Sequence, residues 1–392
     1  MFKEMFNKLV IVLLVIVVLF GAYLILNSMK PFEGPKPQPS VQIATVSTIP
    51  PASSPSPAKL EVAVITVPEC ADCFNVDAFV FALQQNGADL KIQKYSHNST
   101  EGADLVKKYK IMKLPTLIMS GETSKIDQLD ALLENAAENV DGKWVLRDIS
   151  PPYLDTQTSK IVGMLSIKTI LEPSCVQCKK ASVPVDSPPI DVLELGSVMK
   201  QIGVGILEDA KIYTNTSEGK ALVEKYNITM LPAIIISKDI DAYEAFKTAF
   251  LRVGTAEMDG VIVTRALNPP FFNVTTGKEE GLLTIAYIKP GDSCTDCYDY
   301  NMHTQALAEI GVVPIASLYY DYDSLAGANY TKEYNLTKFP VMLLSPEIRY
   351  YPAFMMVSNQ IGGFEKDGWF VFRNFDVLPE GTKYFDLTTN KT

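Results

Sequence analysis

The hydrophobic and polar positions after Lys59 follow one order of elements, and that order is repeated three times. Each repeat begins with a run of β-branched and apolar residues with few charges, which is typical of a strand buried on both faces. A helix, a second strand, a helix with a Ser or Thr cap, a third strand, a further helix and a last strand are predicted to follow. The opening strands are predicted at 61–67, 161–171 and 282–288.

This alternation of strands and helices predicts the fold class α/β, with the elements of each repeat arranged in three layers. The repeat period is about 100 residues or more, which is far longer than the period of solenoid repeats. We therefore expect each copy to be a domain of its own. The predicted domains are residues 59–160, 161–278 and 279–392.

The chain before the repeats has a different pattern. Residues 9–29 are uncharged and mostly aliphatic, and about 20 such residues are enough to cross the ~30 Å hydrocarbon core of a membrane. A cleaved signal peptide is the alternative, but its apolar region normally has about 7–15 residues and ends at a small-x-small site, which Tyr23-Leu24-Ile25-Leu26 does not offer. We expect a transmembrane anchor over 1–29 and an extended Pro/Ser-rich linker over 30–58.

The charge of the chain argues against one class of partner. The net charge is −10 and the pI is about 4.9, whereas a nucleic-acid partner requires a basic face. We identify no lysine or arginine cluster in the sequence, and we expect no nucleic-acid partner.

All six cysteines belong to three Cys-x-x-Cys pairs, one in each repeat: Cys70 with Cys73, Cys175 with Cys178, and Cys294 with Cys297. Such a pair can form a disulfide, bind a metal or exchange disulfides with a partner. As structural cross-links the pairs would add little stability. A disulfide that closes a four-residue loop stabilises a fold by only ~2 kcal/mol, against ~5 kcal/mol for a loop of about 100 residues. A redox role is our interpretation, and inert disulfides are the alternative.

A metal site is the third reading of the cysteines. Four thiolates from two repeats could surround a zinc or copper ion, but the pairs lie in separate predicted domains. The two histidines add little to such a site, because His97 stands beside a sequon and His303 follows the third pair on a predicted helix. We interpret both as surface residues and expect no metal.

A second landmark follows each pair: a tyrosine and, six residues later, a proline that begins the third predicted strand. These are Tyr109 and Pro115, Tyr226 and Pro232, and Tyr334 and Pro340. The proline lies 45 residues after the first cysteine in the first repeat, 46 in the third and 57 in the second. With a cysteine pair at the start of a helix and a proline before a strand at this distance, each repeat resembles the thioredoxin superfamily.

The resemblance implies a cis peptide bond before each of these prolines and a substrate groove beside it. It also implies that the first cysteine of each pair is an exposed nucleophile and that the second is a buried resolving thiol. In the second pair, Lys179 and Lys180 should favour the Cys175 thiolate over those of the other pairs. The implied catalytic residues are Cys70, Cys73, Cys175, Cys178, Cys294 and Cys297. The implied groove residues are Leu114, Pro115, Leu231, Pro232, Phe339 and Pro340.

Seven Asn-x-Ser/Thr sequons and the cysteine pairs both favour a compartment outside the reducing cytosol. The sequence therefore predicts a single-pass membrane protein whose C-terminal bulk is extracytoplasmic or on the cell surface. Its expected function is thiol–disulfide oxidoreductase or isomerase activity on exported proteins, with an unidentified electron partner and no cofactor beyond redox-active disulfides. The alternative is a non-enzymatic surface interaction protein built on the same fold. The sequons begin at Asn98, Asn215, Asn227, Asn273, Asn329, Asn335 and Asn390.

Overall fold

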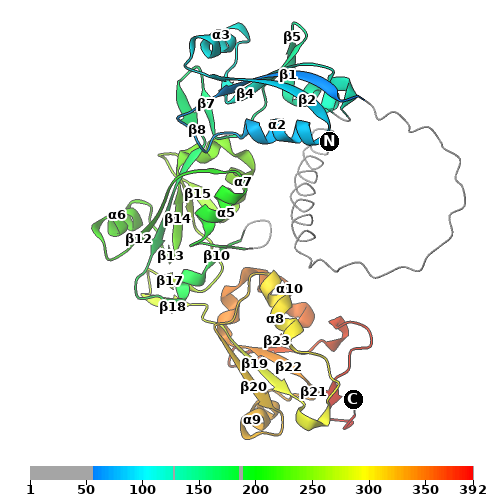
Figure 1. Cartoon of the computed structure of the whole chain (residues 1–392). Coiled ribbons are helices and arrows are strands. Elements are labelled where there is room, and N and C mark those ends of the chain that lie inside the picture. The colour runs from blue at the N-terminus through cyan, green and yellow to red at the C-terminus, as the bar shows by residue number, and fades with distance from the viewer. Residues whose placement is uncertain (1–55, 127–128, 185–188, 392) are drawn as a thin grey trace, which may run out of the picture. The chain divides into compact units, whose positions relative to one another are not determined.

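The computed structural model describes residues 56–126, 129–184 and 189–391 (Figure 1). The predicted membrane anchor, and the predicted linker as far as residue 55, lie outside these residues. In the described part of the chain, no helix is long and apolar enough to cross a membrane. Three five-stranded sheets follow one another along the sequence, joined by helices, which agrees with the predicted α/β class. The exact boundaries of the three repeats stay a prediction.

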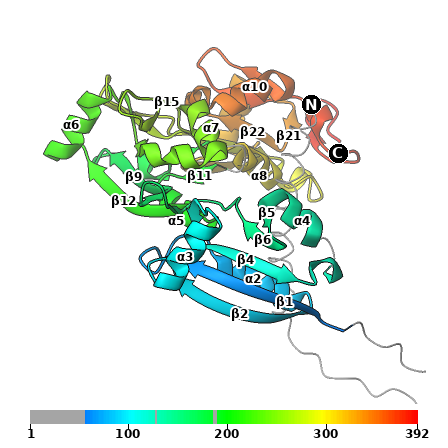
Figure 2. The same ribbon diagram turned by 90° about the horizontal axis from the view of Figure 1, so that it is seen from above.

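The sheet of the first repeat has the strand order β2-β1-β4-β6-β5. β1 pairs in parallel with β2 and antiparallel with β4, which begins directly after Pro115. The strands are β1 (Ala58–Thr66), β2 (Ala88–Ser96), β4 (Thr116–Gly121), β5 (Ala137–Val140) and β6 (Lys143–Leu146), and the helices are α2 (Val76–Gln85), α3 (Thr100–Lys108), η1 (Thr123–Lys125) and α4 (Leu129–Ala136). A small sheet joins β3 (Lys113–Leu114), β7 (Tyr153–Asp155) and β8 (Lys160–Val162). Figure 2 shows α2 lying along the sheet.

The second repeat has the equivalent order β12-β9-β14-β16-β15. Its predicted opening strand at 161–171 is divided, because Gly163 adopts a φ of 89° between β8 and β9. The sheet strands are β9 (Met164–Leu171), β12 (Gly205–Tyr213), β14 (Ala233–Ile236), β15 (Gly254–Ala256) and β16 (Ile262–Thr264). The helices are η2 (Gln177–Lys180), α5 (Leu195–Gln201), α6 (Ser217–Lys225), η3 (Lys238–Ala242) and α7 (Glu244–Val253), and short strands are β10 (Ser182–Val183), β11 (Ile190–Asp191), β13 (Met230–Leu231), β17 (Phe271–Asn273) and β18 (Lys278–Glu280).

The third repeat has the order β20-β19-β22-β24-β23, and its short strands β21 and β25 pair with each other. The strands are β19 (Thr284–Lys289), β20 (Ala316–Asp321), β21 (Lys338–Phe339), β22 (Val341–Leu344), β23 (Gly362–Phe364), β24 (Phe370–Phe372) and β25 (Phe385–Asp386). The helices are η4 (Gly291–Ser293), α8 (Asn301–Glu309), α9 (Leu325–Glu333), η5 (Pro346–Tyr350), α10 (Pro352–Ile361) and η6 (Phe375–Val377).

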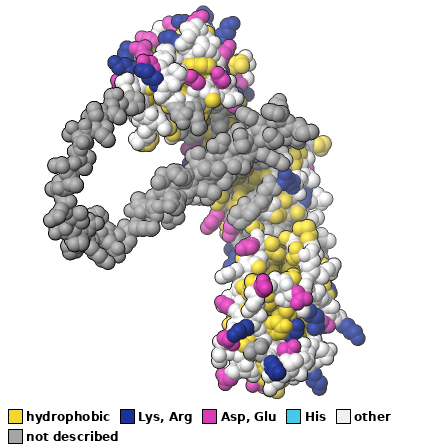
Figure 3. Space-filling view, turned by 90° about the vertical axis from the view of Figure 1, so that its right-hand side faces the viewer, with side chains coloured by type: hydrophobic (Ala, Val, Ile, Leu, Met, Phe, Trp, Pro, Cys, Tyr) yellow, Lys and Arg dark blue, Asp and Glu magenta, His cyan; other side chains and the backbone are white. Residues whose placement is uncertain are grey.

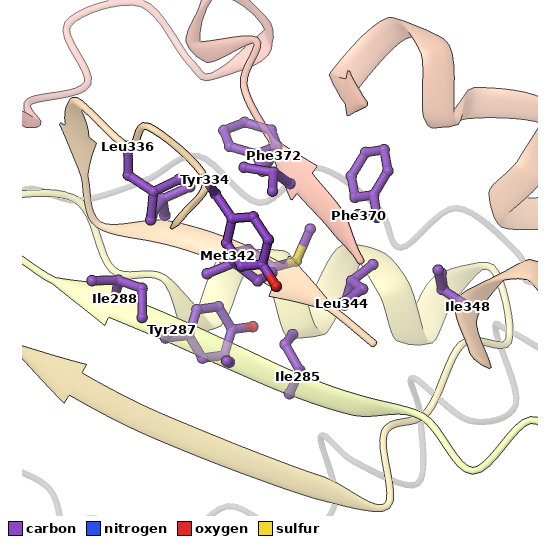
Figure 4. Packing of buried hydrophobic residues seen from close by; sticks show 14 of the residues in the cluster. Ile285, Tyr287, Ile288, Tyr334, Leu336, Met342, Leu344, Ile348, Phe370 and Phe372 are labelled. Carbon is purple, nitrogen blue, oxygen red and sulfur yellow. The ribbon is translucent and has the colours of Figure 1, made fainter. Parts of the chain in front are cut away.

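The core of the third repeat explains why its central strands are so apolar. All four residues of β22 are buried, and Figure 4 shows Met342 and Leu344 from this strand beside their partners Tyr287 and Ile285 from β19. Phe370 from β24 packs edge-on against Phe354 of α10, with ring centroids 4.9 Å apart. Strands buried on both faces need apolar residues at every position, which is the pattern that the sequence presents.

The helices α3, α6 and α9, which follow the second strand of each sheet, begin with the same capping motif. The hydroxyls of Ser99, Thr216 and Ser324 each accept a hydrogen bond from the backbone N–H of a glycine three residues later, which caps the helix. At Gly327 an added Cβ would lie 1.9 Å from the carbonyl oxygen of Asp321, so only glycine fits where the helix meets the end of β20.

Candidate functional site

Each cysteine pair lies in the loop after the first strand of its sheet, and each pair forms a disulfide. The Cα atoms are 5.3 Å apart in the first and second pairs and 5.5 Å apart in the third. All six cysteines lie in the described residues, and none of them is free.

The prediction that the first cysteine opens a helix is wrong in the first and third repeats, whereas the short helix expected in the second repeat, where prolines follow the pair, is confirmed. In the first repeat the helix α2 begins at Val76, because the side chain of Asn75 accepts a hydrogen bond from the N–H of Ala78 (3.1 Å) and caps it there. In the third repeat the side chain of Asp299 accepts from the N–H of Asn301 (2.9 Å), at the start of α8. These polar side chains set the start of each helix after the second cysteine. In the first and third repeats the first cysteine therefore lies outside the first helical turn, where the helix dipole would favour a thiolate.

The helix after the second pair is displaced further. Only the single turn η2 follows Cys175, and the α-helix α5 begins at Leu195. Part of the longer spacing of this repeat between its pair and Pro232 lies between η2 and α5.

The exposure of the sulfur-bearing residues differs between the three pairs. In the first pair Cys70 is partly exposed and Cys73 is 8% exposed, which is the order that the resemblance implies. In the second pair both residues are buried, with Cys175 at 0% and Cys178 at 2%. In the third pair the order is reversed, since Cys294 is 8% exposed and Cys297 is partly exposed.

The peptide bonds before the three landmark prolines are cis, as the resemblance implied. Leu114, Leu231 and Phe339, which precede them, are buried. In the third repeat the pair and the proline come together, because Cys297 Sγ lies 3.8 Å from the carbonyl oxygen of Phe339. The bonds Pro151–Pro152 and Pro269–Pro270 are also cis, which the sequence analysis missed.

A cavity of about 260 Å³ opens beside the third pair. Both cysteines and Pro340 line it, so a molecule in this space would touch the disulfide and the proline at once. Its other walls carry Tyr298 and Tyr300 and the charged side chains of Lys289, Asp299 and Asp321. Lys289 and Asp321 form an ion pair with an N–O distance of 3.1 Å.

Sequence reasoning missed a buried hydrogen-bond chain next to this cavity. The hydroxyl of Tyr298 donates to the carbonyl oxygen of Pro340 (2.7 Å) and lies 3.0 Å from Nε2 of His303. Because the single hydroxyl hydrogen goes to the carbonyl, we assign the hydrogen of the second bond to Nε2. His303 thus donates to Tyr298.

The surface position predicted for His303 is wrong, since the residue is only 8% exposed. Burial lowers the pKa of His303 to about 4 and raises the pKa of Tyr298, so both side chains are neutral at neutral pH. The spacing of His303 and Leu307 was the available signal, because residues four apart lie on the same helix face and Leu307 is apolar.

A carboxylate stands directly before the first pair. Glu69 Oε1 lies 2.5 Å from Nε2 of His97, which is itself partly buried. The backbone N–H of Glu69 and the His97 ring hold the pKa of Glu69 below its ordinary value. This negative charge next to Cys70 disfavours a thiolate there.

A lysine cluster that the sequence analysis failed to identify surrounds a second cavity, of about 470 Å³, in the first repeat. Lys108, Lys110 and Lys113 line it together with Arg147, whose charge is paired with Glu138 at 2.8 Å. None of the cysteines lines this cavity. On the face that Figure 3 shows, basic and acidic side chains are interspersed.

Metal ligation was the third reading of the cysteines. Within the part of the chain that the structure describes, no group of three or more His, Cys, Asp and Glu side chains is placed to hold a metal ion.

No protein-family model matches the sequence, and no curated protein sequence matches it. Among solved structures, ERdj5 form II is 12% identical to this chain, with a TM-score of 0.14. The match covers 76% of this chain and 39% of the ERdj5 chain, so this chain spans about two fifths of the length of ERdj5. A protein disulfide oxidoreductase from Aeropyrum pernix K1 is 15% identical, with 50% and 86% covered and a TM-score of 0.15. The NTD N/C domain of alkylhydroperoxide reductase AhpF from Enterococcus faecalis is 13% identical, with 46% and 82% covered and a TM-score of 0.15.

The resemblance of the repeats to the thioredoxin superfamily is confirmed by the chain's own features. Each repeat has a mixed sheet whose first strand leads into a Cys-x-x-Cys disulfide. Each also has a cis-proline directly before the antiparallel strand that pairs with that first strand.

Proposed function

We propose that this chain is a thiol–disulfide oxidoreductase in which the first and third cysteine pairs react with substrate. The third pair carries the proposal, because its partly exposed residue Cys297 lies against the carbonyl before a cis-proline, beside a cavity. A peptide lying along Pro340 would bring its own sulfur next to Cys297. Thiol–disulfide exchange requires only this access and a thiolate.

The second pair has a structural role in this proposal. A substrate sulfur cannot reach Cys175 or Cys178 without local opening of the repeat, since both are buried. The positive charge of Lys179 and Lys180 favours a thiolate at Cys175 but gives the substrate no route to it.

The proposal includes the location of the reaction. The apolar stretch at 9–29, the seven sequons and three cysteine pairs support a membrane anchor with the repeats outside the cytoplasm. The substrates would then be thiols and disulfides of exported proteins, and an electron partner would restore the pairs. Protease added to intact cells should release a fragment of nearly full length. Protection of that fragment would mean that the repeats have the opposite orientation and face the cytoplasm.

Turnover tests the chemistry directly. Four forms of the full chain are compared: three that keep one cysteine pair each, with the other four cysteines changed to serine, and one with no cysteine. The substrate is a peptide with one disulfide, and dithiothreitol is the reductant. The forms that keep the first or third pair should accelerate peptide reduction, and the form that keeps the second pair should match the cysteine-free chain.

The competing function is that of a non-enzymatic surface protein with inert disulfides. This function would be supported, and the oxidoreductase proposal rejected, if the intact chain reduces the peptide no faster than the cysteine-free chain.

A further inference from the structure

We propose that Cys297, the second cysteine of its pair, is the sulfur that attacks substrate in the third repeat, and that Cys294 is the resolving thiol. This order is the reverse of the one that the resemblance implies. It rests on the proposed function, because it assigns the two roles within the same disulfide chemistry.

Access is the first reason. Cys294 is part of the hydrophobic core of the third repeat, whereas Cys297 is partly exposed and packs against the outside of that core. The first repeat has the opposite order, since Cys73 is buried and Cys70 is partly exposed. A substrate sulfur must reach the attacking sulfur, so the nucleophile is Cys70 in one repeat and Cys297 in the other.

Position is the second reason. Cys297 Sγ is the sulfur that lies against the carbonyl oxygen of Phe339, at the edge where Pro340 directly precedes β22. The next residue, Tyr298, is fixed on two sides: its backbone N–H donates to the carbonyl oxygen of Lys383 (2.9 Å), and its hydroxyl donates to that of Pro340 (2.7 Å). These bonds hold Cys297 at the rim of the cavity.

Charge is the third reason. Cys294 Sγ lies 3.8 Å from Oδ1 of Asp296, and a carboxylate at this distance opposes a thiolate. Lys383 forms an ion pair with Asp296 (2.6 Å), and both side chains are mostly exposed, so solvent screens both charges and the carboxylate opposes the thiolate only weakly. Burial in apolar surroundings opposes a thiolate at Cys294 as well. The thiolate is therefore better tolerated at Cys297.

The reaction starts from the dithiol form, which a thiol reductant supplies. The Cys297 thiolate attacks one sulfur of a substrate disulfide, a Cys297–substrate bond forms, and the other substrate sulfur leaves as a thiolate and takes a proton from water. Cys294 then loses its proton to water and attacks the Cys297 sulfur, which restores the Cys294–Cys297 disulfide and releases the second substrate thiolate. The substrate gains two electrons, and the dithiol loses two.

The test uses the full chain with only one cysteine of the third pair present. Cys70, Cys73, Cys175 and Cys178 are changed to serine, and either Cys294→Ser or Cys297→Ser is added. The probes are iodoacetamide and glutathione disulfide, and mass spectrometry gives the rate of modification. Cys297 should be alkylated and should form the mixed disulfide at least tenfold faster than Cys294.

The first repeat provides a matched control, in which the rates should have the opposite order. With its pair alone retained, Cys70 in the Cys73→Ser form should react faster than Cys73 in the Cys70→Ser form. Circular dichroism checks the fold, and Cys294→Ala replaces Cys294→Ser if serine unfolds the core. Equal rates at Cys294 and Cys297, or a faster Cys294, would overturn the assignment. A faster Cys297 together with no exchange by the intact pair would refute the proposed function instead.

Discussion

The hydroxyl of Tyr298 donates a 2.7 Å hydrogen bond to the carbonyl oxygen of Pro340, and so joins the cysteine loop of the third repeat to the strand that begins at its cis-proline. The ring of His303 donates a second hydrogen bond to the same hydroxyl. Both donors, the Tyr298 hydroxyl and the His303 ring, lie in a mostly buried region, where a hydrogen bond is stronger and an unpaired polar group is costly.

We predict that Tyr298→Phe loosens the third site. The change leaves the Pro340 carbonyl and the His303 ring without their partner, and each unsatisfied buried group costs about 1–3 kcal/mol. Hydrogen exchange of the α8 amides should accelerate by about tenfold or more, since 1.4 kcal/mol corresponds to a factor of about 10. Tyr300→Phe is the matched control, because Tyr300 lines the same cavity and its hydroxyl has no hydrogen-bond partner among the described residues. Equal exchange in the two variants would contradict the role of the hydroxyl.

We predict a pH dependence of stability from His303. Its pKa is about 4 in the folded chain, against an ordinary value of 6.5, so between these values the unfolded chain binds more protons. The contribution of His303 to the free energy of unfolding is therefore fully present above pH 6.5. It falls as the pH is lowered, and the loss reaches roughly 3 kcal/mol below pH 4.

His303→Gln keeps an N–H donor but does not titrate, so it removes this contribution. Thermal unfolding at pH 7 and pH 4.5 should show a smaller difference between the two pH values in the variant than in the parent chain. His97→Gln serves as the control, because His97 is less buried and lies in the first repeat. A parent and a His303→Gln variant with the same pH dependence would show that His303 does not set it.

The sequence was sufficient to predict the repeated α/β order, because β14 and β22 are wholly apolar and the strands that open the repeats carry few charges. The cis bond before Pro340 was implied by the resemblance to the thioredoxin superfamily, and the structure confirms it. The starts of the helices were wrong because Asn75 caps α2 and Asp299 accepts from the first N–H of α8, both beyond the pair, and local polar side chains outweighed the family pattern. Which sulfur is exposed depends on how the loop lies against the rest of the repeat. No local pattern around Cys175 or Cys294 contains that information.

We predict that Gly327→Ala impairs the third site from a distance. An added Cβ would lie 1.9 Å from the carbonyl oxygen of Asp321, whose side chain lines the cavity beside the cysteines. Moving the backbone to remove this clash typically costs 1–3 kcal/mol, so about that loss is expected, with slower reduction of the third disulfide. Gly363→Ala is the control in the same repeat, since nothing lies within 4 Å of its added Cβ. Rates of reduction by dithiothreitol, in chains that keep only the third pair, should fall for Gly327→Ala alone; an equal fall in both would point to a general effect on the repeat.

We predict that the second disulfide is the slowest of the three to be reduced in the folded chain. A thiolate must reach a sulfur in line with the bond that it breaks, and neither Cys175 nor Cys178 is accessible. Reduction must wait for local opening, which lowers the rate by the fraction of time that the repeat is open. The measurement is reduction by dithiothreitol, quenched with iodoacetamide and mapped by mass spectrometry on the full chain. The second pair should react at least tenfold more slowly than the first, and 8 M urea should remove most of the difference. If the second pair is reduced as fast as the first without urea, the positive charge of Lys179 and Lys180 governs reactivity and burial does not.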